Sequence, residues 1–327
     1  MNKHSCETDS QGRPLSRRGF LGTAAGFAVL PEGGGGVKAL PTKRIAFVAG
    51  VKSHRFGEHA HNAGCLLLAK CLHENVPGVE TVVHQNGWPD KPSFFDGVST
   101  VVLFMDGGDR HPILPHLNTI DELMKQGVGL AVLAYALVVP KGEPGNKFLE
   151  WIGGYYETYW SVNPFWTGRF DKLPEHPITR GVRPFSIYDE WYYHMRLRED
   201  LPGAVTPILT AVPPEKTRQG SDGPHSGNPF VRARKGQPEH VAWAYQRPSG
   251  GRGFGFTGGH YHWSWGQDDF RKLILNAVVW TAGLDVPREG IRSRTPTWEE
   301  LMANQEGRMP EGFSAETARE LIKPRSE

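Results

Sequence analysis

The stretch that decides the fold is Arg44-Ile-Ala-Phe-Val-Ala-Gly-Val-Lys-Ser-His54. A short apolar run that stops at a glycine is typical of a strand buried on both faces. Apolar residues then recur at helical spacing over residues 61–74, and a second strand-like run follows at 81–83. This strand–helix–strand order predicts the first unit of a parallel sheet.

The same alternation continues on both sides of an irregular middle region. Strands are expected at 100–105, 129–133 and 253–257, and amphipathic helices at 116–126 and 267–283. Strands that alternate with helices favour a parallel sheet with helices on both faces. The predicted fold class is therefore α/β, with a doubly wound parallel sheet.

The middle region, residues 151–250, differs in amino-acid composition from the segments before and after it. It is rich in proline, glycine and aromatic residues, and it contains short strand-like runs at 204–209 and 240–244. We interpret residues 151–250 as an aromatic-rich lobe inserted over the sheet. The polar, proline-punctuated segment 287–327 is expected to be a C-terminal tail, with one short helix near 297–304.

The first 41 residues have the features of an export signal. Ser16-Arg-Arg-Gly-Phe-Leu-Gly22 leads into an apolar stretch that ends at Leu30. Paired arginines before such a stretch are typical of a bacterial twin-arginine signal, and a disordered basic tail is the alternative. The apolar run is shorter than the roughly twenty residues that span a bilayer. We expect a signal and linker over 1–41, a domain over 42–286, a periplasmic or otherwise exported location, and no stable membrane insertion after export.

Composition and charge limit the classes of partner. The chain has 327 residues, 38% of them hydrophobic and 11% aromatic, which is enough for a real core. Residues 1–40 contain five bases and three acids, so the remainder carries 32 of each. Residues 41–327 therefore have no net charge, whereas a nucleic-acid-binding protein carries an excess of basic side chains. We expect a small-molecule partner and no nucleic acid, and homo-oligomerisation stays open.

Polar side chains follow three of the expected strands: His54, His59 and His61 follow the first, Asp106 the third, and His260 and His262 the last. The carboxyl ends of parallel strands share one edge of the sheet, so these groups should converge on one crevice. A His-x-His pair on an extended segment points both rings the same way, as metal ligands require. One expectation is a divalent metal such as zinc held by His54, His59, His61 and His260, with Asp106 as a catalytic carboxylate. The alternative is that these histidines bind loops or substrate.

A second cluster is Tyr188-Asp-Glu-Trp-Tyr-Tyr-His194. Glu190 and His194 lie four residues apart, so they share a face on a helix and align on a strand as well. Both arrangements allow a catalytic acid/base pair, and a buried hydrogen-bonded pair is the alternative.

The aromatic lobe and its neighbours are candidates for substrate binding. Flat rings beside polar groups suit sugar rings, although aromatic side chains of this kind also build cores. The expected substrate-binding residues are Tyr135, Trp160, Trp191, Tyr192, His225 and His262.

Several short motifs now stand in a fixed order: Ser53-His54, Glu58-His-Ala-His-Asn-Ala-Gly-Cys-Leu-Leu67, Phe104-Met-Asp-Gly-Gly108, Pro140-Lys-Gly142, Trp151-Ile-Gly-Gly-Tyr155, Asp189-Glu-Trp-Tyr192 and Gly255-Phe-Thr-Gly-Gly-His260. Through them, residues 42–286 resemble the ThuA-like (trehalose-utilisation) family. The resemblance implies a class I glutamine amidotransferase-like, flavodoxin-like fold without the catalytic cysteine. It also implies a role with trehalose and related disaccharides, often through 3-keto sugars, in a family with many exported members.

The chain departs from the family pattern at four positions. Relatives commonly show Leu-His-Tyr-Ala-Val-Glu after the fourth strand, and here Ala134 and Val138 replace the His and the Glu. Phe165 and Phe230 stand where relatives often carry His. The loss of a strand-end histidine removes a potential ligand or base, so turnover rests on the remaining histidines.

Two functions follow from these residues. The first is an exported enzyme that acts on trehalose-like disaccharides or their 3-keto derivatives at a His-rich site, with assistance from a metal. The second is a sugar-binding module without catalysis. An amidotransferase-type hydrolase is disfavoured, because Cys65 and Cys71 lie in the body of a helix and not on a strand–helix turn.

Overall fold

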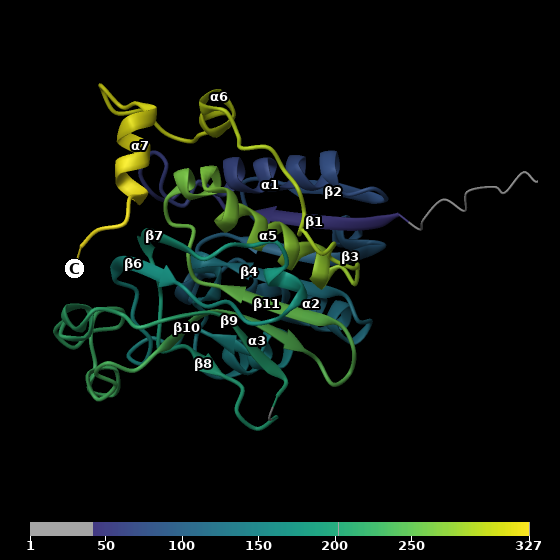
Figure 1. Ribbon diagram of the computed structural model, residues 1–327. Helices are drawn as coiled ribbons and strands as arrows, with labels where there is room; N and C mark the ends of the chain where they lie inside the picture. Colours follow the sequence, from purple (N-terminus) through teal and green to yellow (C-terminus); the bar gives the residue numbers. More distant parts are fainter. Residues whose placement is uncertain (1–41, 202, 327) are drawn as a thin grey trace, which may run out of the picture. The chain divides into compact units, whose positions relative to one another are not determined.

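The computed structural model describes residues 42–201 and 203–326, so the expected export signal lies outside the described residues. Seven strands form the central sheet: β1 (Lys43–Ala49), β2 (Val79–His84), β3 (Val98–Phe104), β4 (Gly129–Leu133), β9 (Val205–Ala211), β10 (Glu239–Gln246) and β11 (Arg252–Phe256). Their order is β2-β1-β3-β4-β11-β10-β9 (Figure 1). The strands from β2 to β11 in this order are parallel, and β10 and β9 add an antiparallel edge. The α/β prediction is confirmed.

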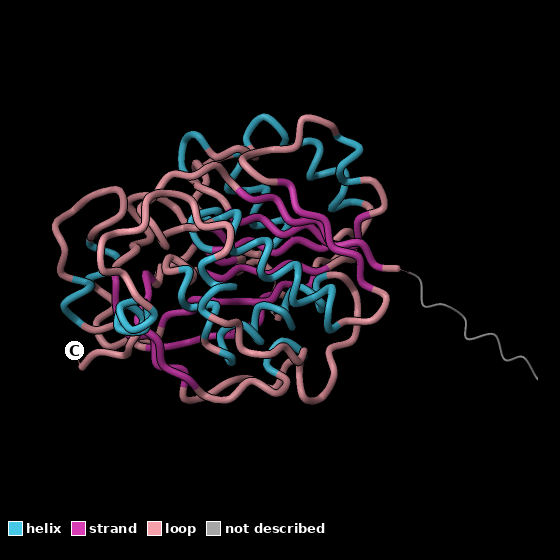
Figure 2. Tube along the Cα trace, turned by 90° about the horizontal axis from the view of Figure 1, so that it is seen from above, coloured by secondary structure: helices cyan, strands magenta, loops and turns pink. Residues whose placement is uncertain are grey.

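Helices cover both faces of this sheet, as the tube in Figure 2 shows. α1 (His61–Asn75) and α5 (Asp268–Thr281) pack on one face, and α2 (Leu117–Lys125) and α3 (Glu143–Ile152) pack on the other. Successive strand residues point to opposite faces, so Phe47 joins the core under α1 and α5 while Val48 joins the core under α2 and α3. The strands therefore read as continuous apolar runs because both of their faces are buried.

The region 151–250 is divided between the central sheet and a smaller segment outside it, residues 154–197, which we call the excursion outside the central sheet. Two small antiparallel sheets lie outside the central one: β5 (Gly154–Tyr155) pairs with β8 (Arg196–Leu197), and β6 (Phe165–Phe170) pairs with β7 (Phe185–Glu190). β9 and β10 belong to the central sheet and not to a separate lobe, because β10 pairs with β11 from Ala242↔Phe256 to Gln246↔Arg252. The short helix α4 (Pro229–Arg232) lies between β9 and β10 in the chain.

The C-terminal tail contains two short helices, α6 (Trp298–Met302) and α7 (Ala315–Ile322). α6 matches the expected helix near 297–304, and a capping box between Thr297 and Glu300 begins it. Phe313, between these helices, packs against Phe56 and Trp263 and so holds the tail near the loop after β1. None of the described helices is both long and apolar enough to cross a membrane.

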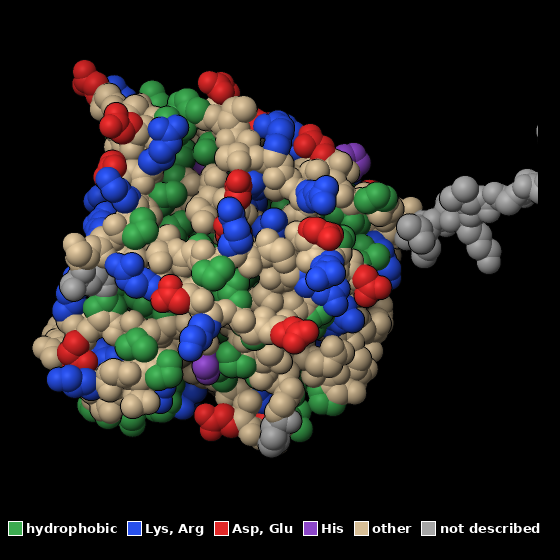
Figure 3. Space-filling model, viewed as in Figure 1, with side chains coloured by type: hydrophobic (Ala, Val, Ile, Leu, Met, Phe, Trp, Pro, Cys, Tyr) green, Lys and Arg blue, Asp and Glu red, His purple; other side chains and the backbone are tan. Residues whose placement is uncertain are grey.

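Short 3-10 helices connect many of these elements: η1 (Pro92–Phe95), η2 (Gly108–Arg110), η3 (Leu114–His116), η4 (Ala134–Leu137), η5 (Pro177–Thr179), η6 (Glu215–Arg218) and η7 (His262–Gly266). Acidic and basic side chains are intermixed over the face shown in Figure 3.

Candidate functional site

The strand order marks the place where a ligand should bind. β1 lies between β2 and β3, so the chain reverses its direction of winding there, and doubly wound folds bind ligands outside the carboxyl ends of strands at such a point. The loop after β1 meets the loop after β11, since the His59 N–H donates to the His260 carbonyl at 2.8 Å. The end of β1 also contacts the end of β3 through a 2.9 Å hydrogen bond from the Gly50 N–H to the Phe104 carbonyl. The predicted convergence of the three loops is therefore present.

Gly50 makes this convergence possible. A Cβ at that position would lie 2.7 Å from Met105 Cβ and 3.1 Å from His61 Nδ1. A larger residue would push apart the two strand ends or displace the imidazole. The glycine that ends the first apolar run thus permits the close approach on which the site depends.

Glu190, the last residue of β7, lies between two imidazoles. Its Oε2 is 3.5 Å from His59 Nε2 and 3.1 Å from His260 Nδ1. All three residues are buried. Within the described residues, they are the one group of three His, Cys, Asp or Glu whose ligand atoms all lie within 4.8 Å of one another. We call His59, Glu190 and His260 the histidine–glutamate centre.

Two side chains hold the Glu190 carboxylate in place. Asn163 donates to its Oε1 from Nδ2 at 2.9 Å, and the Tyr192 hydroxyl donates to its Oε2 at 3.3 Å. The pairing of β6 with β7 sets Phe165 opposite Glu190, which brings the nearby Asn163 within reach. Both carboxylate oxygens are thus engaged by groups from the excursion outside the central sheet.

Asp189 shapes the loop that carries His260. It is fully buried, and it accepts hydrogen bonds from the N–H groups of Gly259 at 2.9 Å and His260 at 3.2 Å. The Ser264 hydroxyl donates to the same carboxylate at 3.2 Å. Because these donors lie on both sides of the His260 backbone, Asp189 sets the position from which that ring reaches Glu190.

Asp106 lies between two further histidines. Its Oδ1 is 3.6 Å from both His54 Nδ1 and His61 Nε2. Within the described residues, Asp106 Oδ1 and His61 Nε2 are buried and have no hydrogen-bond partner. Buried polar atoms without a partner call for a ligand or water. The side chains of His54 and Asp106 are 32% and 29% exposed, so this part of the site is open to solvent.

Burial and pairing set the protonation states. Burial lowers the pKa of His59 to about 3 and that of His61 to about 4. Burial alone would raise the pKa of Glu190, but hydrogen bonds from His260 and His59 outweigh it and hold that pKa at about 2. Burial also acts to lower the pKa of His260, and the bond to Glu190 reverses the direction and raises it. Glu190 is therefore an ionised carboxylate in a buried setting.

The backbone is strained at two points near the site. His59 has φ of +40°, and Ala134, at the turn from β4 into η4, has φ of +52°. A non-glycine residue in this region costs about 1–3 kcal/mol, and such residues cluster at functional sites. At Ala134 the strained turn carries only a methyl group, so β4 brings no ligand or base to the site at that position.

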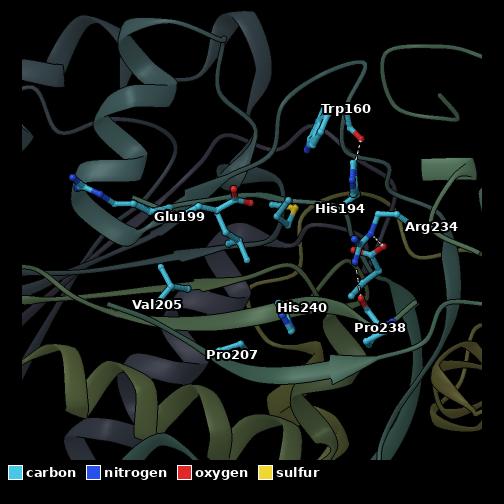
Figure 4. Close-up of a pocket in the computed structure, with 12 residues that line it drawn as sticks. Trp160, His194, Glu199, Val205, Pro207, Arg234, Pro238 and His240 are labelled. Atoms are coloured by element: carbon cyan, nitrogen blue, oxygen red, sulfur yellow. Dashed lines mark hydrogen bonds and ion pairs between the residues drawn. The ribbon is translucent and has the colours of Figure 1, made fainter. Parts of the chain in front are cut away.

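The structure does not join Glu190 to His194. The His194 Nδ1–H donates to the Trp160 carbonyl at 2.9 Å, and the two rings stack with their centres 4.3 Å apart. The chain turns after β7, where His194 adopts φ of +56°, and this turn carries its ring away from Glu190. His194 instead lines a cavity of about 500 Å³ together with Arg234 and His240 (Figure 4). That cavity includes no member of the histidine–glutamate centre, so the structure does not bring the predicted acid/base pair together.

Three of the four tyrosine and tryptophan residues predicted to bind substrate pack against other protein groups. Trp160 packs against His194 and against the Arg196 guanidinium, which lies 3.4 Å from its ring centre. Trp191 is fully buried in the core, where its Nε1 donates to the Ile187 carbonyl at 3.3 Å. The ring of Tyr192 is buried too, and only its hydroxyl reaches Glu190.

The remaining predicted residues divide between the site and the core. The Tyr135 ring lies 6.0 Å from the His59 ring and is half-buried, so it borders the site. His225 contacts the Tyr156 hydroxyl at 3.1 Å, at the outer side of Tyr192. His262 is buried away from the centre, because the chain enters η7 there and does not stay extended as the His-x-His argument required.

Sequence reasoning gave no role to Asn163, and it singled out Phe165 only as a position where relatives often carry His. The Phe165 ring lies edge-on to His260 at 4.8 Å, and Asn163 binds Glu190. Only the antiparallel pairing of β6 with β7 reveals both contacts. Glu58, whose Oε2 is 4.0 Å from His260 Nε2, stood in the same motif as His59 but received no role.

The fold and the site define a doubly wound α/β protein with a histidine–carboxylate centre at its switch point. The sequence model of the ThuA family, described as trehalose utilisation, matches residues 56–281. The chain therefore belongs to the ThuA family, whose description points to a carbohydrate-related function. No curated protein matches the chain.

Two solved structures are similar to this chain at low sequence identity. A ThuA-like protein from Bacteroides uniformis is 15% identical with a TM-score of 0.52, and the match covers 76% of this chain and 94% of that one. A ThuA-like protein from Parabacteroides merdae is 18% identical with a TM-score of 0.46, over 82% of this chain and 100% of that one. The likeness to the first of these agrees with the fold described above.

Proposed function

We propose that this protein is an exported enzyme of carbohydrate metabolism that acts on trehalose-like disaccharides or their 3-keto derivatives. The observation that carries the proposal is the position of Glu190, a buried carboxylate between two imidazoles at the ligand-binding edge of the sheet. Membership of a family described by trehalose utilisation supports the substrate class.

The chemistry of the centre suits proton transfer on a sugar. A 3-keto sugar has a C–H bond beside its carbonyl, and a positioned carboxylate or imidazole can remove that proton while a neighbouring group returns one. Glu190 and His260 are 3.1 Å apart, so they present a carboxylate and an imidazole at the same point of the site. The side chains of Asp106 and His54 are partly exposed, and in this proposal they bind sugar hydroxyls.

A non-catalytic sugar-binding module is the second candidate. The observation that favours it is apolar substitution at the site: Ala134, which follows β4, carries only a methyl group, and the Phe165 ring packs on His260. Apolar groups of this kind can shape a binding site and exclude water from a ligand, but they cannot transfer protons.

Export and a small uncharged substrate form part of the same proposal. The paired arginines at 17–18 and the apolar segment after them support export. The intermixed charges in Figure 3 and the neutral composition of residues 41–327 support a small uncharged ligand over a polyanion.

The experiment is a turnover assay with trehalose and 3-keto-trehalose, in which products are separated by chromatography. The change Glu190→Gln keeps the size of the side chain and removes the carboxylate from the centre, so we expect turnover to fall by about 10²-fold or more. Glu311→Gln, on an exposed tail residue, is the matched control and should leave turnover unchanged. Circular dichroism verifies that both variants fold.

Two results would each contradict part of this proposal. Full turnover by Glu190→Gln would remove Glu190 from the chemistry. Stoichiometric binding of sugar by the wild-type chain, without product after long incubation, would establish the binding module.

A further inference from the structure

We infer that His59, Glu190 and His260 are the protein ligands of a divalent first-row transition metal such as zinc. This assignment corrects the ligand set expected from the sequence, because Glu190 takes the place of His54 and His61. The metal site rests on geometry, and only its use on a sugar rests on the proposed function.

The distances fit a metal shell. Two ligands of a tetrahedral zinc ion, each about 2.0–2.1 Å from the metal, lie about 3.3 Å from each other. Glu190 Oε2 is 3.1 Å from His260 Nδ1 and 3.5 Å from His59 Nε2. These two distances match the spacing that a bound ion would impose, and one ligand atom from each of the three residues lies within 4.8 Å of the others.

The burial of all three ligands gives further support. His59 is 3% exposed, Glu190 8% and His260 7%. Burying a carboxylate and two imidazoles is costly unless each group has a partner, and one bound cation would pair with all three. The His59 backbone is also held in its left-handed conformation, which fixes the ring at the centre despite the strain.

The donor types select the class of metal. Two imidazole nitrogens and one carboxylate oxygen are the ligand set of many catalytic zinc sites and of two-histidine, one-carboxylate iron sites. Calcium and magnesium prefer sites built from oxygen. Three protein ligands also leave positions for water or a substrate oxygen, as a catalytic metal requires.

The surroundings orient the ligands as they do in known metal sites. Asn163 engages Glu190 Oε1 at 2.9 Å, which leaves Oε2 directed at both histidines. Asp189 holds the backbone of the loop that carries His260. Such supporting groups commonly contribute 10–100-fold in metal affinity.

The test measures metal on the purified full chain. After chelator treatment and dialysis, zinc, cobalt, magnesium and calcium are added separately. Elemental analysis and calorimetry give stoichiometry and affinity, and visible absorption reports the cobalt geometry. We expect one zinc or one cobalt per chain, and no comparable binding of magnesium or calcium.

Variants locate the site. Glu190→Gln and His260→Ala should weaken zinc binding by about 10²-fold or more, and Asn163→Ala by about 10–100-fold with all three ligands retained. His73→Ala, on an exposed position of α1, is the control and should bind zinc as the wild type does. Asn163→Ala keeps the test valid if a ligand variant does not fold.

The inference is overturned if the folded wild type binds no zinc or cobalt, or if Glu190→Gln, His260→Ala and Asn163→Ala all bind zinc with wild-type affinity. These outcomes are separate from failure of the proposed function. A chain that binds one zinc and converts no sugar supports the metal site and contradicts the enzyme. A chain that converts sugar at full rate without binding metal supports the enzyme and contradicts the metal site.

Discussion

Two neighbouring carboxylates at the end of β7 have different tasks. Glu190 faces the two imidazoles of the histidine–glutamate centre, whereas Asp189 accepts hydrogen bonds from the backbone of the loop that carries His260. Asp189 is fully buried, and all of its partners are donors. A carboxylate suits that position because it accepts at both oxygens and has nothing to donate.

The change Asp189→Asn tests this arrangement. An amide of nearly the same size would turn an N–H₂ group toward N–H or O–H donors, so at least one buried donor would lose its partner. We expect the free energy of unfolding to fall by about 2–3 kcal/mol. Urea unfolding followed by tryptophan fluorescence measures it.

Asp90→Asn, at an exposed loop position, is the control and should change stability by less than about 0.5 kcal/mol. Equal stability of the two variants would mean that Asp189 does not hold the loop.

Glu157 joins the elements of the excursion outside the central sheet. It follows β5, and its carboxylate accepts from the Arg196 guanidinium of β8 at 2.9 and 3.1 Å. The Tyr155 hydroxyl donates to it at 2.8 Å and the Lys141 ammonium at 3.1 Å. Burial acts to raise the pKa of Glu157, but these bonds outweigh it and lower that pKa from the ordinary 4.5 to about 2.

This lowered pKa predicts acid sensitivity. Between pH 4.5 and 2 the unfolded chain binds the proton and the folded chain does not, so the stabilisation present above pH 4.5 is lost as the pH falls toward 2. In Glu157→Gln this contribution is absent at every pH. Urea unfolding at pH 6 and pH 3 should show a smaller loss of stability for the variant than for the wild type, and an equal loss would contradict the assignment.

Charge is balanced over the body of the molecule. Residues 41–327 contain equal numbers of basic and acidic side chains, and these are intermixed on the face in Figure 3. A chain without an excess of basic side chains does not displace the counterions of a polyanion, and this displacement drives binding to polyanions.

We therefore expect the chain without residues 1–40 to pass through a heparin column at about 0.1 M salt. The full chain, which carries five more bases and three more acids, serves for comparison. Salt-dependent retention of the shortened chain would reveal a basic surface that composition conceals.

The sequence by itself determined the alternation of strands and helices and the meeting of three loops at one edge. Apolar periodicity is local, so the strand at 44–49, the helices at 61–74 and 267–283, and the convergence of His59 and His260 all followed from it. The second tail helix, α7, and the membership of β9 and β10 in the central sheet did not follow, because a polar tail and a proline-rich region carry weak periodic signals.

Only the tertiary structure decided which side chains form the site. Glu190 and His260 are separated by 70 positions in the chain, and the fold of β6, β7 and the loop after β11 brings them together. Turns with positive φ and packing against Trp160 directed His194 elsewhere. Such contacts depend on long-range pairing and backbone turns, and residue spacing in a single sequence does not encode these in readable form.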